Sequence, residues 1–378
     1  MPEMKPATMT AAMPDMKTAT GGIAGPPSGD GAVAGAAEVL LGVRNLSIHY
    51  PIAIGTVRAV TDLSLDVYRG EVLGVVGESG CGKSTLGLSI LNLQKSPGRI
   101  VAGEILVDGH DILALGPEDI RAVRGPKIGM IFQNPLTSLD PLMSIKDHFI
   151  ETMRAHDPKI RKSAIIARAE AMLEDLGIEK RRLSEYPFQL SGGMRQRIMI
   201  GLTLILDPEL LLADEPTTAL DVIVEAGFTE LLAKLKRKYN LTVVLVSHNL
   251  GLVAEIADRI AVMYAGRIVE LATALEIFQD PRHPYTRGLM DCVPNILLDR
   301  KELVAMPGSP PDLVNESPGC PFAPRCPKVF ARCLAETPRL LADTAPTGAA
   351  APAGAAPAGV APALAARAVA CFLHERTN

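Results

Sequence analysis

The chain has 378 residues, 48% of them hydrophobic, and a formal net charge of −4 at pH 7. This length is typical of about two or three domains, and the lack of a basic excess disfavours nucleic acid as the main partner. No apolar run approaches the ~18 residues of a membrane span, the N-terminus lacks the apolar region of a secretory signal, and six cysteines are too few for a disulfide scaffold. We therefore expect a cytosolic protein that does not itself cross a membrane.

Five segments are expected along the chain. Residues 1–37 are rich in Pro, Gly and Ala, so they cannot bury enough apolar surface to offset the entropy of ordering and are predicted to be disordered. Several methionines in this stretch leave the true translation start open. Residues 38–279 carry the strand and helix patterns of an α/β domain. Residues 280–343 are predicted to form an irregular appendage, 344–366 an Ala/Pro-rich linker, and 367–378 a final segment that carries the last cysteine.

The elements expected within the α/β domain are mostly short. Alternating patterns predict antiparallel strands at residues 39–41, 44–50 and 59–67, and a strand at 103–109 that ends in an Asp-Gly turn. Continuous apolar runs, typical of a parallel sheet covered on both faces, lie at residues 72–76, 210–213 and 241–246. Further strands are expected at 128–133, 259–264 and 267–270, and helices at 144–180, 222–239 and 251–256.

A glycine-rich loop follows the apolar run at residues 72–76. Residues 77–85 have the G-x-x-x-x-G-K-S pattern of a P-loop between a strand and a helix. The glycines allow backbone N–H groups to point at phosphate oxygens at a helix N-terminus. Lys83 can then reach the β- and γ-phosphates, and Ser84 can bind Mg²⁺. The sequence therefore predicts nucleotide binding by Gly77, Ser79, Gly80, Cys81, Gly82, Lys83, Ser84 and Thr85.

Two carboxylates follow the apolar run at residues 210–213. In P-loop proteins such a strand is expected beside the strand before the P-loop, which places Asp214 in the Mg²⁺ shell. Glu215, the next residue, can orient or deprotonate the water that attacks the γ-phosphate. An acidic end to a buried strand is also common without any function, so the P-loop is what favours the catalytic interpretation.

A second candidate phosphate site precedes this strand. Ser191, Gly192 and Gly193 open a predicted helix, where a hydroxyl, free N–H groups and the helix N-terminus can bind an anion. One Lys-bearing loop and one Ser-Gly-Gly per chain suggest that two copies meet face to face, each offering its Ser-Gly-Gly to the nucleotide of the other. The alternative is an ordinary capped helix.

Four further positions have candidate roles at a nucleotide site. Gln133 ends a strand and can touch Mg²⁺ or the attacking water, and His248 follows a strand and can contact the γ-phosphate. Tyr50 can stack on adenine, and residues 217–221 can cross a dimer interface. Three of these positions also have a simpler interpretation: Gln133 as a solvated strand end, His248 as a structural histidine and Tyr50 as a core tyrosine.

Taken in order, these motifs resemble those of ATP-binding-cassette ATPases: an aromatic residue, Walker A, Gln loop, signature, Walker B with its Glu, Asp loop and switch His. The resemblance spans roughly residues 38–275. It implies a P-loop NTPase cassette of the α/β class, with a mixed-sheet core, an antiparallel β subdomain and a helical subdomain. It also implies ATP hydrolysis with Mg²⁺, in which Glu215, His248 and Gln133 are catalytic.

The chain also resembles the ATP-binding subunits of dipeptide and oligopeptide permeases, at residues 132–141, 186–197, 263–267, 283–286, 307–313 and 320–327. This resemblance implies ATP-driven peptide import with two membrane permease subunits and an extracytoplasmic solute-binding protein. It implies a second cassette subunit, paralogous or identical, and a peripheral place on the cytoplasmic face of a bacterial inner membrane. Phe188 replaces a usual His, and Asn249 replaces a usual Asp.

Two other functions stay open from the sequence. One is a permease ATPase for another solute, such as nickel or a modified peptide. The other is a soluble cassette ATPase acting on DNA or ribosomes, which the absence of long heptad repeats and the single Walker A disfavour.

The C-terminal cysteines suggest a metal centre. Cys320, Cys326 and Cys333 follow a C-x₅-C-x₆-C pattern, with Cys371 further along, and a cytosolic location argues against disulfides. Zinc sites favour paired C-x₂₋₄-C spacing, whereas iron–sulfur clusters need four cysteines at looser spacing. The permease resemblance extends through these cysteines and also points to a [4Fe-4S] cluster. Zinc and free buried thiols are the alternatives.

Overall fold

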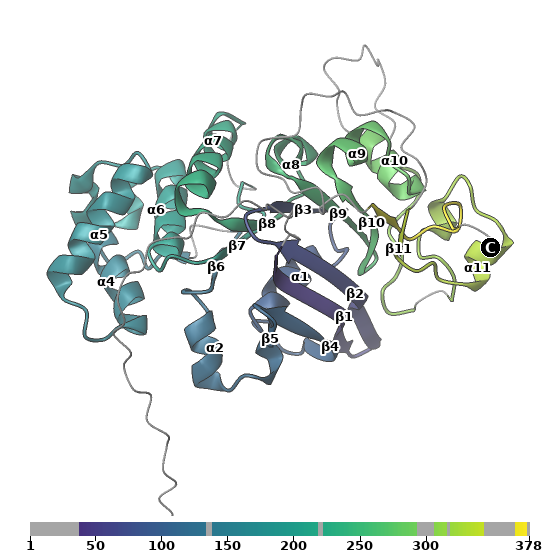
Figure 1. The fold of residues 1–378 in the computed structure, drawn as a ribbon, viewed down its shortest axis with the longest axis horizontal. Helices are drawn as coiled ribbons and strands as arrows, with labels where there is room; N and C mark the ends of the chain where they lie inside the picture. The colour runs from purple at the N-terminus through teal and green to yellow at the C-terminus, as the bar shows by residue number, and fades with distance from the viewer. Residues whose placement is uncertain are drawn as a thin grey trace, which may run out of the picture. The chain divides into compact units, whose positions relative to one another are not determined.

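The computed structural model describes residues 38–133, 138–217, 222–292, 306–315, 318–343 and 367–375 (Figure 1). The predicted disordered extension at 1–37 and the predicted linker at 344–366 lie outside these ranges. Residues Ala36–Asn378 pack as one unit, and the segment boundaries predicted within it stay predictions. No helix in the described ranges is long and apolar enough to cross a membrane.

A mixed sheet forms the centre of the fold. Its strands are β3 (Val72–Val76), β6 (Ile128–Ile131), β7 (Leu210–Asp214), β8 (Thr242–Val246), β9 (Arg259–Tyr264), β10 (Arg267–Thr273), β11 (Leu341–Ala342) and β12 (Ala368–Val369). They are arranged in the order β11-β12-β10-β9-β3-β8-β7-β6. The five strands from β9 to β6 are parallel. Every residue of β3, β7 and β8 is buried, as the continuous apolar runs predict.

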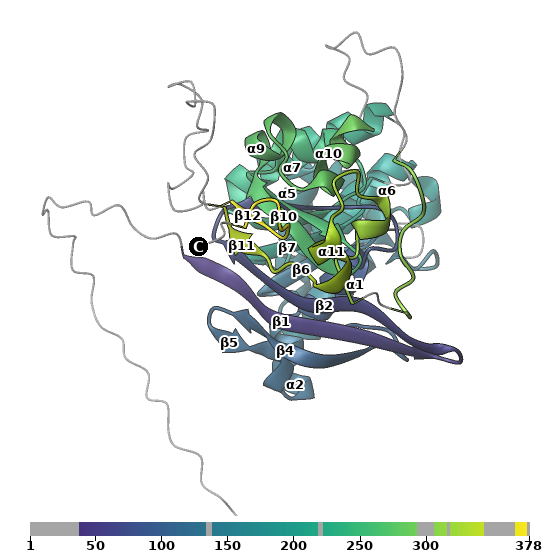
Figure 2. The ribbon, with the colours of Figure 1, turned by 90° about the vertical axis from the view of Figure 1, so that its right-hand side faces the viewer.

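An antiparallel sheet packs beside this core, in the order β2-β1-β4-β5 (Figure 2). Its strands are β1 (Val39–Ile52), β2 (Gly55–Tyr68), β4 (Arg99–Val107) and β5 (His110–Asp111). β1 and β2 form one long hairpin, which extends past the predicted strand ends. Asp108 and Gly109 both have positive φ in the predicted Asp-Gly turn between β4 and β5, as a tight hairpin turn requires.

Most of the helices pack against the central sheet (Figure 1). The helices are α1 (Lys83–Ile90), α2 (Pro117–Val123), α4 (Ile145–His156), α5 (Lys162–Asp175), α6 (Gly192–Leu204), α7 (Val222–Tyr239), α8 (Leu250–Ile256), α9 (Ala274–Gln279), α10 (Pro284–Asp291) and α11 (Ala331–Ala335). Of these, α2 lies beside the antiparallel sheet and α11 lies in the C-terminal region. Helices α4, α5 and α6 gather near β6 in Figure 1 and pack around the buried side chains of Phe149, Leu173 and Ile198. The single helical pattern predicted at 144–180 is therefore two helices, separated at Asp157 and the proline that follows it.

The C-terminal region lies at the opposite edge of the central sheet, beyond β10 (Figure 1). Val369 pairs with Glu270, and Ala368 pairs with Leu271, so the last described segment extends the sheet. The buried Arg367 guanidinium donates to the backbone carbonyl of Glu276 at 3.2 Å. The described part of the predicted final segment is thus attached directly to the α/β core.

Candidate active site

The loop at residues 77–85 leads from β3 into α1. Gly77, Gly80 and Gly82 have φ of 151°, 81° and 102°, a region that favours glycine. A Cβ at Gly77 would lie 2.2 Å from the Met263 carbonyl oxygen, and one at Gly82 would lie 2.3 Å from the Ala59 carbonyl oxygen. The loop is therefore enclosed by two other strands, and only glycine fits at these two positions.

Lys83 is the first residue of α1 and is 5% exposed. Its Nζ donates to the carbonyl oxygens of Gly77 at 2.8 Å and Glu78 at 3.0 Å. The N-cap of α1 is Gly82, which has no side chain to cap the helix. The ammonium group and the first N–H groups of the helix are therefore at the same place, an arrangement suited to phosphate.

The Ser84 hydroxyl meets the carboxylate that ends β7, at a distance of 2.9 Å from Asp214 Oδ1. Burial is the main cause that raises the pKa of Asp214 above its ordinary value. A hydroxyl and a carboxylate are hard oxygen ligands of the kind that Mg²⁺ prefers. A cation at this position would offset the cost of burying the carboxylate, so the pair fits a magnesium site.

The structure corrects one detail of the sequence interpretation. β7 does not lie beside β3, because β8 runs between them. Asp214 still reaches Ser84, since α1 has contacts with both β7 and β8.

Glu215, Gln133 and His248 come together at the carboxyl ends of β7, β6 and β8. Gln133 Nε2 donates to Glu215 Oε2 at 3.0 Å, and His248 Nδ1 lies 3.4 Å from the same oxygen. Glu215 has φ of 45°, an uncommon value for a residue other than glycine. This backbone conformation turns the chain at the end of the strand and directs the Glu215 carboxylate toward its two neighbours.

The Ser-Gly-Gly sequence caps α6. Ser191 Oγ accepts from the Met194 N–H at 3.3 Å, and Ser191 and Gly192 are exposed. Within the described part of the chain, no hydrogen bond or ion pair joins residues 191–193 to residues 77–85. Gln196, one turn further along α6, donates to the carbonyl oxygen of Pro216 and so links this helix to the end of β7.

The remaining candidates have local contacts. The Tyr50 ring lies against Gly98, where a Cβ would approach it to 2.5 Å, and its role with adenine stays a prediction. In the predicted Asp loop, Thr217 Oγ1 donates to Glu225 Oε1 at 2.9 Å, and residues 218–221 lie outside the described ranges. Asn249 donates to the same Glu225 oxygen at 2.7 Å, so the residue after His248 is tied to this loop.

Two residues that contact the P-loop were not identified as site residues from the sequence. The Glu78 N–H donates to the Tyr285 hydroxyl at 2.9 Å, and Arg325 forms an ion pair with the Glu78 carboxylate. Tyr285 lies in residues 283–286 and Arg325 in residues 320–327, two stretches that carry the permease resemblance. In the sequence, only that resemblance drew attention to Tyr285 and Arg325, and it did not give a role to either residue.

The four C-terminal cysteines line one pocket, together with His283 and Phe322. Burial raises the pKa of the Cys371 thiol to about 11 and raises the pKa values of Cys320 and Cys326. The cavity that the side chains leave is only about 10 Å³. In the described ranges, no group of three or more His, Cys, Asp or Glu side chains is arranged to hold a metal ion. The thiols are thus gathered in one place without forming a preformed ligand set.

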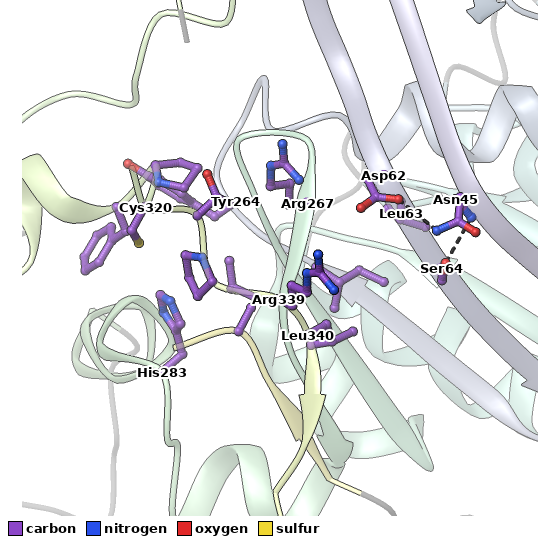
Figure 3. A pocket seen from close by; sticks show the side chains of 17 residues that line it. Asn45, Asp62, Leu63, Ser64, Tyr264, Arg267, His283, Cys320, Arg339 and Leu340 are labelled. Carbon is purple, nitrogen blue, oxygen red and sulfur yellow. Dashed lines mark hydrogen bonds between the residues drawn. The ribbon is translucent and has the colours of Figure 1, made fainter. Parts of the chain in front are cut away.

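A second and larger pocket of about 630 Å³ adjoins the cysteine pocket (Figure 3). Asn45, Asp62 and Ser64 of the antiparallel sheet lie on one side, and His283 and Cys320 lie on the other. It contains none of the residues predicted to bind ATP.

Comparisons with known proteins agree with this geometry. A family model described as "ABC transporter" matches residues 60–218, and one described as "Oligopeptide/dipeptide transporter, C-terminal region" matches residues 269–333. The dipeptide transport ATP-binding protein DppD of Bacillus subtilis is 45% identical over 299 residues, which cover 78% of this chain and 89% of that protein. DppD of Escherichia coli is 44% identical, covering 80% of this chain and 92% of that protein.

Solved structures show the same fold. A dimeric ATP-binding cassette in a post-hydrolysis state, bound to ADP and Pi, is 28% identical with a TM-score of 0.56, and the match covers 62% of this chain and 98% of that one. The cbiO1 protein of Clostridium perfringens is 27% identical with a TM-score of 0.56, covering 64% of this chain and 92% of that one. The predicted P-loop cassette fold is confirmed.

Proposed function

We propose that this chain, which belongs to the ATP-binding-cassette family of dipeptide and oligopeptide transport ATP-binding proteins, is the ATPase subunit that drives import of such peptides through partner permeases. The observation that carries the proposal is the match to peptide-transport relatives along both the cassette and the C-terminal region. An ATPase of this family is peripheral to the membrane, and we place the chain on the cytoplasmic face of a bacterial inner membrane.

The proposed ATP site follows the contacts described above. Lys83, Ser84 and the amides of residues 77–85 bind the phosphates, and Ser84, Asp214 and Gln133 hold Mg²⁺. Magnesium, when bound, neutralises charge on the phosphate oxygens. Glu215 is the general base, and its carboxylate is oriented by Gln133 and His248.

The site is proposed to be completed by a second cassette subunit, either paralogous or identical. Ser191, Gly192 and Gly193 of one subunit contact the γ-phosphate bound to the other. Two observations support this arrangement: Ser191 and Gly192 are exposed, and among the described residues they make no hydrogen bond with the P-loop of their own chain.

An apolar groove near Gln133 supports docking to a permease. The groove has a volume of about 260 Å³, and its apolar walls include Leu91, Leu93, Phe132, Leu202 and Leu206. The Phe132 side chain is 42% exposed although it directly precedes Gln133. A permease segment bound in this groove would therefore be coupled to the position of Gln133. Ligand-driven closure of the cassettes would move Gln133 and, with it, the permease segment.

Purification from membranes in mild detergent tests this proposal. We expect two permease subunits and a second cassette to co-purify, and we expect ATP hydrolysis in liposomes to rise when a peptide-loaded solute-binding protein is added. Stimulation by nickel instead of peptide would favour the alternative importer. If no membrane subunit co-purifies with the chain, the proposal is contradicted.

For the cysteine pocket we propose a structural [4Fe-4S] cluster held by Cys320, Cys326, Cys333 and Cys371. The convergence of all four thiols on one pocket supports it, and the pocket has to widen to accept a cluster. Anaerobically purified protein should absorb broadly near ~400 nm and lose this absorption in Cys326→Ser. Colourless protein with stoichiometric zinc would show that the four thiolates bind zinc instead of a cluster. Protein without any metal would show that the cysteines are free thiols.

A further inference from the structure

Arg325 is distant from the cassette motifs in sequence, yet its side chain reaches the P-loop. Its Nη1 and Nη2 donate to the two carboxylate oxygens of Glu78 at 2.9 and 3.0 Å. Glu78 is the second residue of the P-loop. The Arg325 side chain is 5% exposed and that of Glu78 is 25% exposed. A bidentate and largely buried ion pair therefore joins the C-terminal region to the predicted phosphate-binding loop.

Several contacts fix the direction of the Arg325 side chain. Nε donates to the Pro307 carbonyl oxygen at 2.9 Å, and Nη1 also lies 3.3 Å from the Tyr264 hydroxyl. The guanidinium carbon lies 5.8 Å from the ring centre of Tyr264 and 6.0 Å from that of Phe322. The guanidinium is thus held in position by contacts other than its ion pair with Glu78.

The Glu78 backbone is held as firmly as its side chain. Its N–H donates to the Tyr285 hydroxyl at 2.9 Å, and its carbonyl accepts from Lys83 Nζ at 3.0 Å. Glu78, whose carbonyl oxygen accepts one of the two hydrogen bonds of Lys83 Nζ to the loop, is therefore itself positioned by Arg325 and Tyr285.

A carboxylate at this position is electrostatically adverse to ATP. Glu78 carries a negative charge on the same loop that has to receive polyphosphate, and partial burial strengthens the repulsion. The guanidinium of Arg325 neutralises this charge and keeps the carboxylate turned toward the C-terminal region.

We propose that Arg325 is a positioning residue for ATP binding, which acts by neutralising and orienting Glu78 of the P-loop. This inference rests on the proposed placement of the phosphates at residues 77–85. It assigns the C-terminal region a direct part in the affinity for nucleotide.

The test measures binding of a fluorescent ATP analogue with Mg²⁺ to the full chain. Arg325→Gln leaves the Glu78 charge without its partner, so we expect the Kd to rise about 10–100-fold, the equivalent of a lost charge-assisted hydrogen bond. Arg325→Lys keeps the charge without the bidentate geometry and should have an intermediate Kd. Arg287→Gln is the matched control, because Arg287 is exposed on α10 and its Nε donates to the Pro281 carbonyl; its Kd should equal that of wild type.

The double variant separates a charge effect from a purely structural one. Glu78→Gln combined with Arg325→Gln removes both charges, so the Kd should return to within about threefold of wild type. A double variant as weak as Arg325→Gln would overturn the proposal, as would Arg325→Gln with wild-type affinity. If Arg325→Gln does not fold, judged by its melting temperature, a wild-type Kd in Arg325→Lys would overturn it.

Lys83→Ala distinguishes failure of the premise from failure of the inference. Loss of binding in this variant supports the placement of the phosphates at the P-loop. Wild-type binding in Lys83→Ala would overturn that placement and the role of Arg325 with it.

Discussion

Replacing Glu215 by glutamine tests the proposed catalytic base with little change of shape. The amide oxygen of the new side chain can still accept from Gln133, which lies 3.0 Å from the present carboxylate oxygen, and can still face His248. The positive φ of the backbone at residue 215 is also retained. Only the basicity and the charge of the group are lost.

The size of the effect distinguishes a base from a structural hydrogen-bond partner. Loss of a general base slows a reaction by about 10²–10⁴, which corresponds to about 2.7–5.4 kcal/mol of barrier. If the substitution only weakened the hydrogen bond that Gln133 donates, the cost would be about 0.5–1.5 kcal/mol, which slows the reaction roughly tenfold at most. Hydrolysis in Glu215→Gln should therefore fall well beyond the tenfold limit.

Phosphate release at saturating MgATP measures this fall, and size-exclusion chromatography with ATP measures closure of the two cassettes. We expect ATP to bind with near wild-type affinity and the closed dimer to accumulate, because its hydrolysis is blocked. Hydrolysis at the wild-type rate would remove Glu215 from the catalytic role. Loss of ATP binding would show that the side chain acts in binding instead.

Three further outcomes are expected. Ser191→Arg should block cassette closure while ATP affinity of the isolated chain stays near wild type; a dilute monomer that hydrolyses ATP as fast as the complex would contradict the shared site. Arg259→Met should lower the free energy of unfolding in urea by about 3–5 kcal/mol, because it leaves buried Glu71 unpaired; a loss below about 1 kcal/mol would refute this. Hydrogen bonds from Lys127 and Arg69 hold the pKa of Glu209 below its ordinary value. Their stabilising effect is present above about pH 4.5 and is lost as the pH falls through the lowered pKa. Between pH 5 and pH 3, the melting temperature of Glu209→Gln should therefore fall less than that of the wild-type protein.

The elements that could be predicted from the sequence are those fixed by local chemistry. The buried strands β3, β7 and β8 are visible as apolar runs because both faces of a parallel sheet are covered. The P-loop is visible because only glycine tolerates the backbone at Gly77 and Gly82.

The order of strands could not be predicted in the same way. An apolar run does not encode its neighbours, and so the sequence placed β7 beside β3, where the structure has β8. The helix break after α4 was also missed, although Pro158, directly after Asp157, is a helix breaker that the sequence shows. Arg325 and Glu78 are 247 residues apart, and no periodicity or spacing connects them.

The C-terminal region shows how a weak strand can still determine the position of a distant residue. β12 has only two residues, too few to be stable alone. Arg367 directly precedes it, is 4% exposed, and lies 3.7 Å from the carboxylate of Glu270 on β10. The Ala370 N–H then donates to the Val269 carbonyl oxygen at 2.8 Å. Cys371, the next residue, is therefore positioned by the central sheet, whereas the turn that ends in Cys326 carries Arg325 to the P-loop. The side of the cysteine pocket that contains Cys326 is therefore continuous with the contact between Arg325 and Glu78 of the P-loop.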